Sequence, residues 1–401
     1  MKPPLLAVVV FACSTIGAPV FAQSPEESAA QARMHLGPLA VNPTIGLTNL
    51  GVDNNVFNEA DEDHPKSDMT ATVTPAADMW IRFGSAWVSG TVREDLVYYR
   101  TYASERSVNG TYRASLAMPM GRFSFHGNAS YVNTRDRTSP EIDTRSRHID
   151  SLLNGGAELR AFGKTFIDAT VQQARVAYGD GEEYDGANLQ TELNRTMTSV
   201  IMSIRHEMTP VTALTLDVAR QQDRFDYSPD RDSDSTRLLA GVRFNARIVG
   251  SAALGYQQFT PLSPQLPEYH GPIAQVDLAV AVVGGTHVAV HLARSLAYSY
   301  EFDQPYYIGT GGTLALTQSV YGPFDVVVHG GLENMAYRGR LTATAPPERT
   351  DQVTYWGGGI GYRVAPTMRV GLNLDQQQRQ SDVAGHSYGG LRFGTAVTYG
   401  F

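Results

Sequence analysis

The sequence predicts an antiparallel β-barrel that spans the outer membrane of a Gram-negative bacterium. Three features predict it: an export signal at the start, alternating polar and apolar residues through the middle, and an aromatic strand at the C-terminus. Alternation with a period of two places one set of side chains on each face of a strand. One face of such a strand can meet lipid while the other meets water.

The first residues have the properties of a secretion signal. Lys2 precedes an apolar stretch that ends at Phe21-Ala22. A positive start, an apolar core and small residues before the cleavage point are what signal peptidase recognises. Pro and Gly interrupt the stretch before it reaches the ~20 apolar residues that a transmembrane helix needs. We therefore predict a signal peptide over residues 1–22, cleaved after Ala22.

Cys13 gives a second interpretation of the same segment. Val10-Phe11-Ala12-Cys13 loosely resembles a lipobox, which would make Cys13 a lipidated N-terminus, but Phe is a poor second residue there. Cleavage after Ala22 is the preferred interpretation. It leaves a mature chain without cysteine, so neither disulfides nor thiol chemistry would be available to the protein.

The composition is compatible with a large barrel and gives no support for a nucleic-acid partner. The 401 residues include 38 Gly and 20 Tyr, and the formal net charge is −8. A negative chain has no electrostatic attraction for nucleic acid. The mean hydropathy of −0.23 does not exclude a membrane protein. Every second residue of a large barrel faces water, so its average hydropathy is that of a soluble chain.

The clearest alternating segment runs from Met368 to Asp375, with apolar residues at even positions and polar or small residues at odd positions. In a helix the same apolar residues would wind around the axis. Similar segments are separated alternately by short Gly or Pro breaks and by longer charged breaks. We predict about eighteen strands, with sixteen as the alternative, joined by short periplasmic turns and longer extracellular loops. A secreted propeller or β-helix would show repeated motifs, and none is visible.

Some segments fit the pattern less well. Residues 189–207 alternate poorly, and Arg294 falls on the apolar side of its strand, which a β-bulge would correct. Val249–Ser251 is predicted to be a short turn. Residues 23–40 are predicted to form a short periplasmic tail, in which Ser24-Pro25-Glu26-Glu27 indicates a frayed segment or one short helix. The barrel then occupies residues 41–401.

The C-terminal strand indicates how the chain is assembled. From Leu391 to Phe401 the odd positions are large or β-branched, and the aromatic residues Tyr399 and Phe401 end the chain. This resembles the signal that the bacterial barrel-assembly machinery recognises, although Ala396 stands where Gly is usual. A soluble protein can also end on an edge strand, but the export signal favours the barrel. We predict that Tyr399 and Phe401 form the assembly signal and that the assembly machinery is a partner.

The N-terminal strands resemble a known family. A strand that ends in Asp53-Asn54-Asn55-Val56-Phe57 is followed by an acidic loop and by a strand from Ser67 to Pro75. This arrangement, over about residues 41–80, resembles outer-membrane barrels of the beta-barrel porin 2 family. The resemblance implies an outer-membrane location. Some members accompany exopolysaccharide synthesis and export genes, which implies a periplasmic polysaccharide-export protein as a partner. It supplies no substrate and no catalytic motif.

Three motifs resemble chemical sites but lack the required context. His287 and His291 lie in an alternating segment, where residues four apart are separated by ~13 Å, too far to share a zinc ion. Gly357–Gly361 has no helix after it, as a nucleotide loop requires. Asp230-x-Asp232-x-Asp234 lacks the Gly and the final Glu of a calcium loop. We predict no metal, cofactor or catalytic centre.

The inward-facing charged residues are the candidate pore-lining residues. An eight-stranded barrel is filled by its own side chains, whereas ~16–18 strands leave an aqueous channel. The candidates are Arg113, Glu158, Arg160, Asp168, Asp217, Arg243, Arg247, Asp277, His291, Asp325, Glu333, Arg363, Arg369 and Arg392. Their mixed signs predict neither simple cation nor simple anion selectivity. Inward Tyr and Gln would suit carbohydrate, but Tyr is also frequent at membrane interfaces.

These features predict a porin-like pore surrounded by outer-membrane lipid and lipopolysaccharide. The family resemblance implies a conduit for exopolysaccharide, and a pore for small solutes is the main alternative. A structural or adhesin barrel plugged by its loops is a further alternative. An enzyme at the outer rim is the least favoured, because the sequence does not show converging catalytic groups.

Overall fold

The computed structural model describes residues 24–282, 284–341, 349–383 and 385–400. The predicted signal peptide, with Cys13, and the terminal Phe401 lie outside these residues, so the statements about them stay predictions.

The described residues form one closed antiparallel β-barrel. The main sheet has 19 strands, of which β1 (Met34–Leu36) pairs only with the start of β2; the other 18 form the barrel, which β21 closes by pairing with β2. The predicted strand number is therefore confirmed. The barrel strands are β2 (Leu39–Asp53), β3 (Asp68–Phe83), β4 (Ala86–Tyr99), β5 (Ser107–Met120), β6 (Phe123–Asp136), β7 (Ser146–Phe162), β8 (Thr165–Tyr178), β11 (Arg195–Thr209), β12 (Thr212–Phe225), β13 (Ser233–Asn245), β14 (Ile248–Pro261), β15 (Tyr269–Val282), β16 (Thr286–Tyr298), β17 (Tyr306–Ser319), β18 (Phe324–Arg338), β19 (Thr350–Ala365), β20 (Met368–Gln380) and β21 (Tyr388–Gly400).

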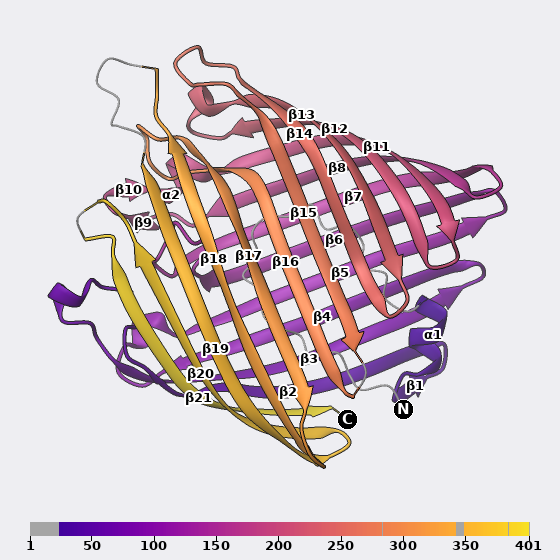
Figure 1. Cartoon of the computed structure of the whole chain (residues 1–401), viewed down its shortest axis with the longest axis horizontal. Coiled ribbons are helices and arrows are strands. Elements are labelled where there is room, and N and C mark those ends of the chain that lie inside the picture. The colour runs from indigo at the N-terminus through magenta and orange to yellow at the C-terminus, as the bar shows by residue number, and fades with distance from the viewer. Residues whose placement is uncertain (1–23, 283, 342–348, 384, 401) are drawn as a thin grey trace.

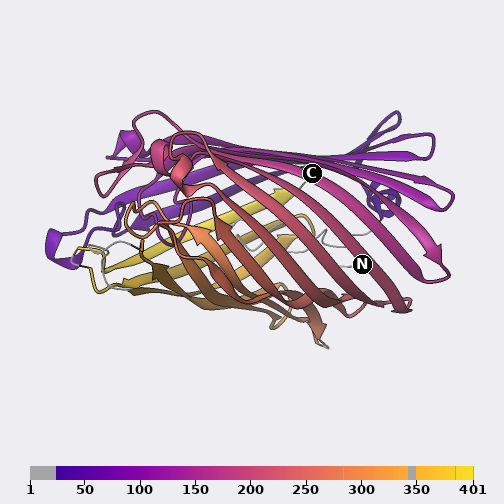
Figure 2. The same cartoon turned by 90° about the horizontal axis from the view of Figure 1, so that it is seen from above.

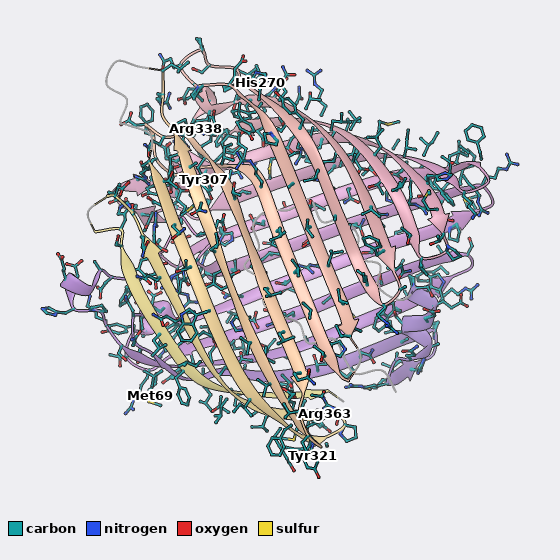
Figure 3. The ribbon with its side chains drawn as sticks, viewed as in Figure 1. Met69, His270, Tyr307, Tyr321, Arg338 and Arg363 are labelled. Carbon is teal, nitrogen blue, oxygen red and sulfur yellow. The ribbon has the colours of Figure 1, made fainter. Side chains whose placement is uncertain are left out.

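The two ends of the barrel differ in their connections. Short turns join the strands at one end, and the longer loops gather at the other (Figures 1 and 2). In Figure 3, Tyr321 lies at the short-turn end, whereas His270 and Arg338 lie at the long-loop end. Outer-membrane barrels place short turns in the periplasm and long loops outside the cell, so the long-loop end is the extracellular mouth.

The outer face of the barrel is apolar over a continuous band. In β11, the side chains of Val200, Met202 and Ile204 are 50%, 48% and 45% exposed, and they alternate with inward-facing residues. Exposed aromatic side chains gather at the short-turn end, as expected at a membrane interface. They are Phe83, Phe123, Tyr321, Phe324, Tyr362 and Tyr399. This band is the lipid-facing surface.

The predicted short turn at Val249–Ser251 was placed three residues too late. Asn245 pairs with Val249, and the turn consists of Ala246 and Arg247. Gly250 misled the prediction because it lies inside β14, where its φ is 128° and a Cβ atom would stand 1.9 Å from the carbonyl oxygen of Asp277. The glycine permits close approach of β15 rather than forming a turn.

Two irregular segments have simple explanations. Residues 189–207 alternate poorly because they contain the short helix α2 (Leu189–Leu193) before β11 begins. The bulge proposed near Arg294 is wrong, because the ladder from Ala274 through Arg294 to Thr310 is regular. Arg294 faces outward, and its guanidinium donates to the carbonyl of Pro272 and to the hydroxyl of Thr310.

A short helix precedes the barrel. Helix α1 (Pro25–Ala30) begins after Ser24, whose hydroxyl accepts a hydrogen bond from the Glu27 amide at 3.2 Å. This capping and the Pro at the first helical position match the pattern in the sequence. None of the helices in the described ranges is long and apolar enough to cross a membrane.

Candidate functional site: the lumen wall and the extracellular mouth

The predicted pore-lining residues lie on the inner face of the strands, with one exception. Arg247 lies in the turn between β13 and β14 because that turn falls earlier than predicted. The others alternate with the exposed apolar side chains and therefore face the interior. They are Arg113, Glu158, Arg160, Asp168, Asp217, Arg243, Asp277, His291, Asp325, Glu333, Arg363, Arg369 and Arg392. That they line an open pore stays a prediction.

One ion pair of the wall reaches over a glycine in the intervening strand. His329 of β18 and Asp375 of β20 both lie opposite Gly357 of β19, and their side chains approach to 2.9 Å. A Cβ atom at Gly357 would stand 2.2 Å from the Asp375 carboxylate and 2.6 Å from His329 Nε2. The glycine makes room for the pair.

The same arrangement recurs at Gly361 and Gly156. Arg369 donates to Asp325 at 2.9 Å across β19, and a Cβ atom at Gly361 would stand 2.2 Å from the Arg369 guanidinium. The Gly357–Gly361 run is therefore part of the wall, in a strand rather than a nucleotide loop. His126 and Asp168 approach to 2.6 Å across β7, where Gly156 lies opposite His126 and a Cβ atom would stand 2.6 Å from the His126 ring.

On β7 and β11, close to the His126–Asp168 pair, charges of both signs form a connected cluster. Arg205 lies 2.9 Å from Glu158 and 2.6 Å from Glu207. Arg243 interacts electrostatically with Asp217 as well as with Arg205 and Glu158. The Arg205 and Glu158 side chains are 19% and 26% exposed, so the pair is in contact with the interior space rather than sealed.

The two histidines at spacing four lie on β16, as the alternation predicts. His291 Nδ1 lies 2.5 Å from the carboxylate of Asp277, its cross-strand neighbour on β15. The pair belongs to the polar wall. Among the described residues no group of three His, Cys, Asp or Glu side chains is placed to hold a metal ion.

The loop of residues 137–145, between β6 and β7, crosses the mouth of the barrel. Ser299, between β16 and β17, donates to the Glu141 carboxylate at 2.5 Å. Six barrel strands separate β7 from β16 on one side, and eight separate β17 from β6 on the other. The contact therefore joins nearly opposite parts of the wall, and the loop passes through the interior.

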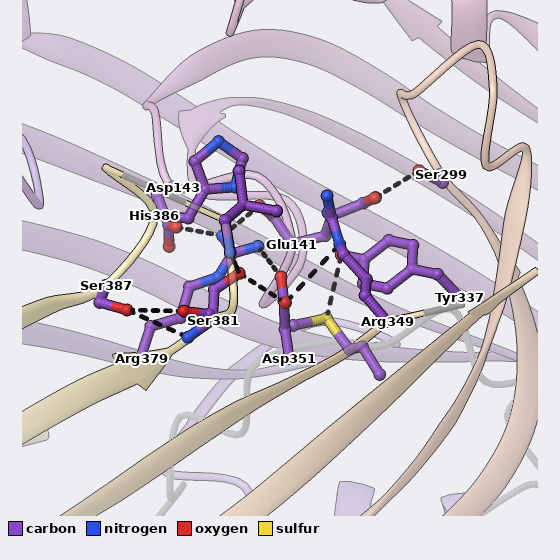
Figure 4. Close-up of polar contacts among 12 residues, drawn as sticks. Glu141, Asp143, Ser299, Tyr337, Arg349, Asp351, Arg379, Ser381, His386 and Ser387 are labelled. Atoms are coloured by element: carbon purple, nitrogen blue, oxygen red, sulfur yellow. Dashed lines mark hydrogen bonds and ion pairs between the residues drawn. The ribbon is translucent and has the colours of Figure 1, made fainter. Parts of the chain in front are cut away.

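Arg379, near the end of β20, holds this loop in place (Figure 4). Its guanidinium lies 2.5 Å from Asp143 and 2.6 Å from Asp351, and it donates to the carbonyl of Glu141 at 2.8 Å. The side chains of Arg379 and Asp351 are fully buried. The Asp143 carboxylate also accepts from the Tyr388 hydroxyl at 2.6 Å. A buried charge needs such partners, because desolvation costs several kcal/mol per ion.

An apolar cluster seals the same region. Ile142 packs with Tyr178, Leu189, Leu193 and Tyr300, all of which are buried. These residues come from three different connections and the end of β8. The long-loop end therefore contains the packed core of the molecule, whereas the strands below it have their apolar side chains outside.

Burial changes the protonation of Glu141, which lies in the loop and outside the membrane-spanning strands. Desolvation raises its pKa from 4.5 to about 8, although the Ser299 hydrogen bond and the charges of Arg379 and Arg349 oppose the shift. Glu141 therefore holds a proton in the docked loop over a pH range in which an exposed glutamate is ionised.

A second set of buried arginines connects the remaining loops. The fully buried side chain of Arg231 lies 2.7 Å from Glu192 and donates to the carbonyl of Ser299 at 2.6 Å. Arg340 lies 2.6 Å from Asp230. In the Asp230-x-Asp232-x-Asp234 motif each carboxylate thus has its own partner: Asp232 accepts from the Phe225 amide, and Asp234 pairs with Arg224. The three carboxylates do not converge on a cation.

Several residues that hold the mouth together are not predicted by the alternation; they are Glu141, Asp143, Ser299, Arg231, Arg340, Asp351 and Arg379. They lie in long breaks or at strand ends, where alternation does not indicate whether a side chain points into the barrel or away from it. One signal was available, namely charges of both signs in loops that also contain Ile142, Leu189 and Tyr300. A loop that only faces water has little need for such apolar residues.

Comparison with known proteins identifies the family. The sequence model described as "Putative beta-barrel porin 2" matches residues 31–401. The chain belongs to this family. The resemblance seen in the N-terminal strands is thereby confirmed and extends through the whole barrel, which is an outer-membrane porin-like barrel.

Solved structures of outer-membrane proteins are similar at low identity. OccAB3 from Acinetobacter baumannii has a TM-score of 0.49 at 8% identity, covering 90% of this chain and 99% of that one. OpdK from Pseudomonas aeruginosa has a TM-score of 0.46 at 9% identity, covering 90% and 98%. A BenF-like porin from Pseudomonas fluorescens Pf-5 has a TM-score of 0.46 at 10% identity, covering 90% and 98%. No curated protein sequence is significantly similar to this chain.

Proposed function

We propose that this barrel is a passive pore for small polar solutes, with its passage limited by the loop of residues 137–145. The observation that carries the proposal is the partly exposed ion pairs of the wall, such as Arg205 with Glu158. Charges sealed in a dry interior would cost several kcal/mol each. A lumen that contains water avoids this cost, and a barrel of ~16–18 strands is wide enough to hold it.

A conduit for exopolysaccharide is the second candidate, and it rests on the family resemblance. The geometry of the mouth favours small solutes over a polymer. Arg379, Asp143 and Asp351 fix the crossing loop with buried ion pairs, so a polymer could pass only after these contacts separate. A polysaccharide-export protein in the periplasm would be the partner that such a conduit requires.

The alternatives without transport are less well supported. The packed mouth also suits a structural or adhesin barrel, but that role gives no reason for a wall with polar groups on most inward positions. An enzyme at the rim would need a nucleophile or water, a base and an orienting group together. The polar groups at the mouth are instead engaged in holding loops, as Arg379 and Arg231 show.

Liposome swelling with neutral sugars of increasing size tests the proposal. Liposomes containing the wild type should swell in a monosaccharide and not in an oligosaccharide of several units. Arg379→Ala should admit larger sugars, because it releases the crossing loop. Arg220→Gln is a matched control, since Arg220 lies on the outer face and is 68% exposed.

Two outcomes would contradict the proposal. Absence of swelling in every sugar, for both the wild type and Arg379→Ala, would favour a plugged structural barrel. Passage of long oligosaccharides through the wild type would favour the polymer conduit.

A further inference from the structure

The outward faces of the strands change character near the long-loop end. In β12, Leu214, Leu216 and Val218 are exposed and apolar, but the next outward positions are Arg220, Gln222 and Arg224. In β20 the outward positions after Leu374 are Gln376, Gln378 and Gln380. The strands therefore extend beyond the apolar band, to the height of the lipid headgroups of the outer leaflet.

At this height a cleft of about 550 Å³ opens on the outside of β4–β7. These strands are sequential neighbours in the wall (Figure 1). The outward-facing residues that line the cleft are Leu96, Tyr98, Arg106, Val108, Arg135 and Arg147. Leu96 pairs with Val108, and Arg135 pairs with Arg147, so these four side chains form one row across the strands. The cleft thus brings three guanidinium groups onto the lipid-facing surface.

The three arginines differ in how they are held. Arg106 stacks on Tyr98 with its guanidinium 4.5 Å from the ring centroid, and it donates to the carbonyls of Tyr99 and Arg100. These contacts with neutral groups fix its position and leave its charge unopposed. Arg147 is exposed, and within the described ranges it has no side-chain hydrogen bond or ion pair.

Glu105 and Glu94 lie near the cleft, and each is already engaged. Glu105 is buried and lies 3.6 Å from Arg135. Glu94, below the cleft on β4, accepts a hydrogen bond from the Tyr112 hydroxyl. Glu182 lies beside Gly179, next to Arg147, and forms no ion pair with it in the described residues. Arg106 and Arg147 therefore carry an excess positive charge at the cleft. Three outward arginines of β8 and β12 differ: Arg175 pairs with Asp226, and Arg220 and Arg224 pair with Asp234.

The lower part of the cleft is apolar and aromatic. Leu96 and Val108 are 43% and 65% exposed. Below them Tyr112 and Tyr131 lie side by side on β5 and β6, with ring centroids 6.2 Å apart. Aromatic pairs of this kind mark the boundary between acyl chains and headgroups. A ligand in the cleft would meet cations above and hydrocarbon-compatible side chains below.

We propose that this cleft binds one phosphorylated glycolipid of the outer leaflet, of the lipid A type. Its phosphate would accept hydrogen bonds from Arg106 and Arg147, and an acyl chain would lie along Leu96 and Val108. Arginine suits phosphate because its planar guanidinium donates two parallel hydrogen bonds. A free anion would not use the apolar surface, and a neutral lipid would leave the arginines unpaired. The site is independent of whether the lumen conducts.

Native mass spectrometry of the full-length protein in detergent, with added bis-phosphorylated lipid A, tests the site. The wild type should retain one lipid A molecule more tightly than it retains the same lipid with both phosphates removed. Each of Arg106→Gln and Arg147→Gln should weaken retention by about tenfold, because each removes a charge-assisted hydrogen bond. Arg220→Gln is the matched control, since it removes an outward arginine at similar height that already has a carboxylate partner.

Heat-modifiable migration on gels verifies that each variant is folded. Equal retention of lipid A by the wild type and by the Arg106→Gln, Arg147→Gln double variant would overturn the proposal. Competition by inorganic phosphate at the same concentration as lipid A would also overturn it, because the site would then be one for a soluble anion. An equal loss of retention in Arg220→Gln would show that general surface charge attracts the lipid, and would overturn the specific site.

Discussion

The mouth and the wall of this barrel use the same residue types in opposite surroundings. At the mouth, Arg379 and Asp351 are paired with both side chains fully buried. In the wall, His126 and Asp168 are paired with side chains 32% and 20% exposed. The mouth network also joins β20 to a loop far away in the sequence, since Arg379 meets Asp143 across 236 positions. The interstrand wall pairs described above join strands that are adjacent or separated by one strand.

The difference shows what each set of charges does. A fully buried pair is costly to break, because removal of one partner leaves an uncompensated charge. Such pairs fix the loop of residues 137–145 across the mouth. A partly exposed pair gains little stability, but it presents charge to the interior space. Burial rather than residue type therefore separates the structural charges from those that would meet a solute.

Among the variants, Arg379→Ala should destabilise the docked loop at the mouth most. It leaves Asp143 and Asp351 buried without their shared partner, a change that typically costs ~3–5 kcal/mol. We expect the amides of residues 137–145 to exchange much faster in hydrogen–deuterium exchange, with the barrel strands still protected. Arg205→Ala, in the wall, should cost about 1 kcal/mol or less and leave the loop protected. If the amides of residues 137–145 exchanged equally fast in both variants, the buried mouth pairs would stabilise the loop no more than the wall pairs do.

The proton on Glu141 makes the mouth sensitive to pH. Its pKa is 4.5 in an exposed chain and about 8 in the docked loop, so the docked state binds the proton more tightly. The docked loop is therefore most stable below the lower value and loses stability as the pH rises through this range. Conductance should increase between about pH 5 and about pH 9 in the wild type.

Glu141→Gln is the control for this prediction, because it keeps the shape and cannot lose a proton. Its conductance should vary far less over the same range. Histidine ordinarily changes its charge near neutral pH, and the histidines of the wall, such as His126 and His291, would remain in the variant. An unchanged pH profile in Glu141→Gln would therefore assign the dependence to the wall rather than to the mouth.

A smaller effect is expected from a charge reversal in the wall. Arg243 faces the interior near the short-turn end of β13, away from the mouth network. Arg243→Glu should raise the cation-to-anion permeability ratio by roughly twofold, because it replaces a positive charge at the lumen surface by a negative one. The reversal potential in a salt gradient measures it. Arg294→Glu, on the outer face, should leave the permeability ratio unchanged. An equal shift in this variant would argue against an inward position of Arg243 and an outward position of Arg294.

Much of the wall could be predicted from sequence, because alternation is a local property. The period of two placed Arg369 and Asp325 on the inner face, and eighteen strands followed from the spacing of breaks. Arg247 was misplaced because Gly250 resembles a turn residue while it permits close strand packing. The partners across Gly357 and Gly361 were not predicted, since they depend on which strands are next-nearest neighbours.

The mouth could not be predicted by the same reasoning. Arg379 meets Asp143 across 236 positions of sequence, and Ser299 meets Glu141 across 158. The local sequence of a loop does not indicate which distant loop it will contact. These contacts depend on the closed barrel, which brings loops from opposite walls to one end.

Single-channel recording in planar lipid bilayers measures whether the lumen contains water and whether the loop of residues 137–145 narrows it. The comparison is between the wild type and a variant in which Ser139–Ile142 is replaced by a Gly-Ser linker of equal length, which removes Glu141 and the apolar anchor Ile142. We expect discrete conductance steps in the wild type, because the lumen contains water. We expect larger steps in the variant, because this loop narrows the lumen. Steps of equal size would show that the loop does not limit passage. Electrical silence of both proteins, with folding verified by heat-modifiable migration, would contradict the water-filled lumen itself.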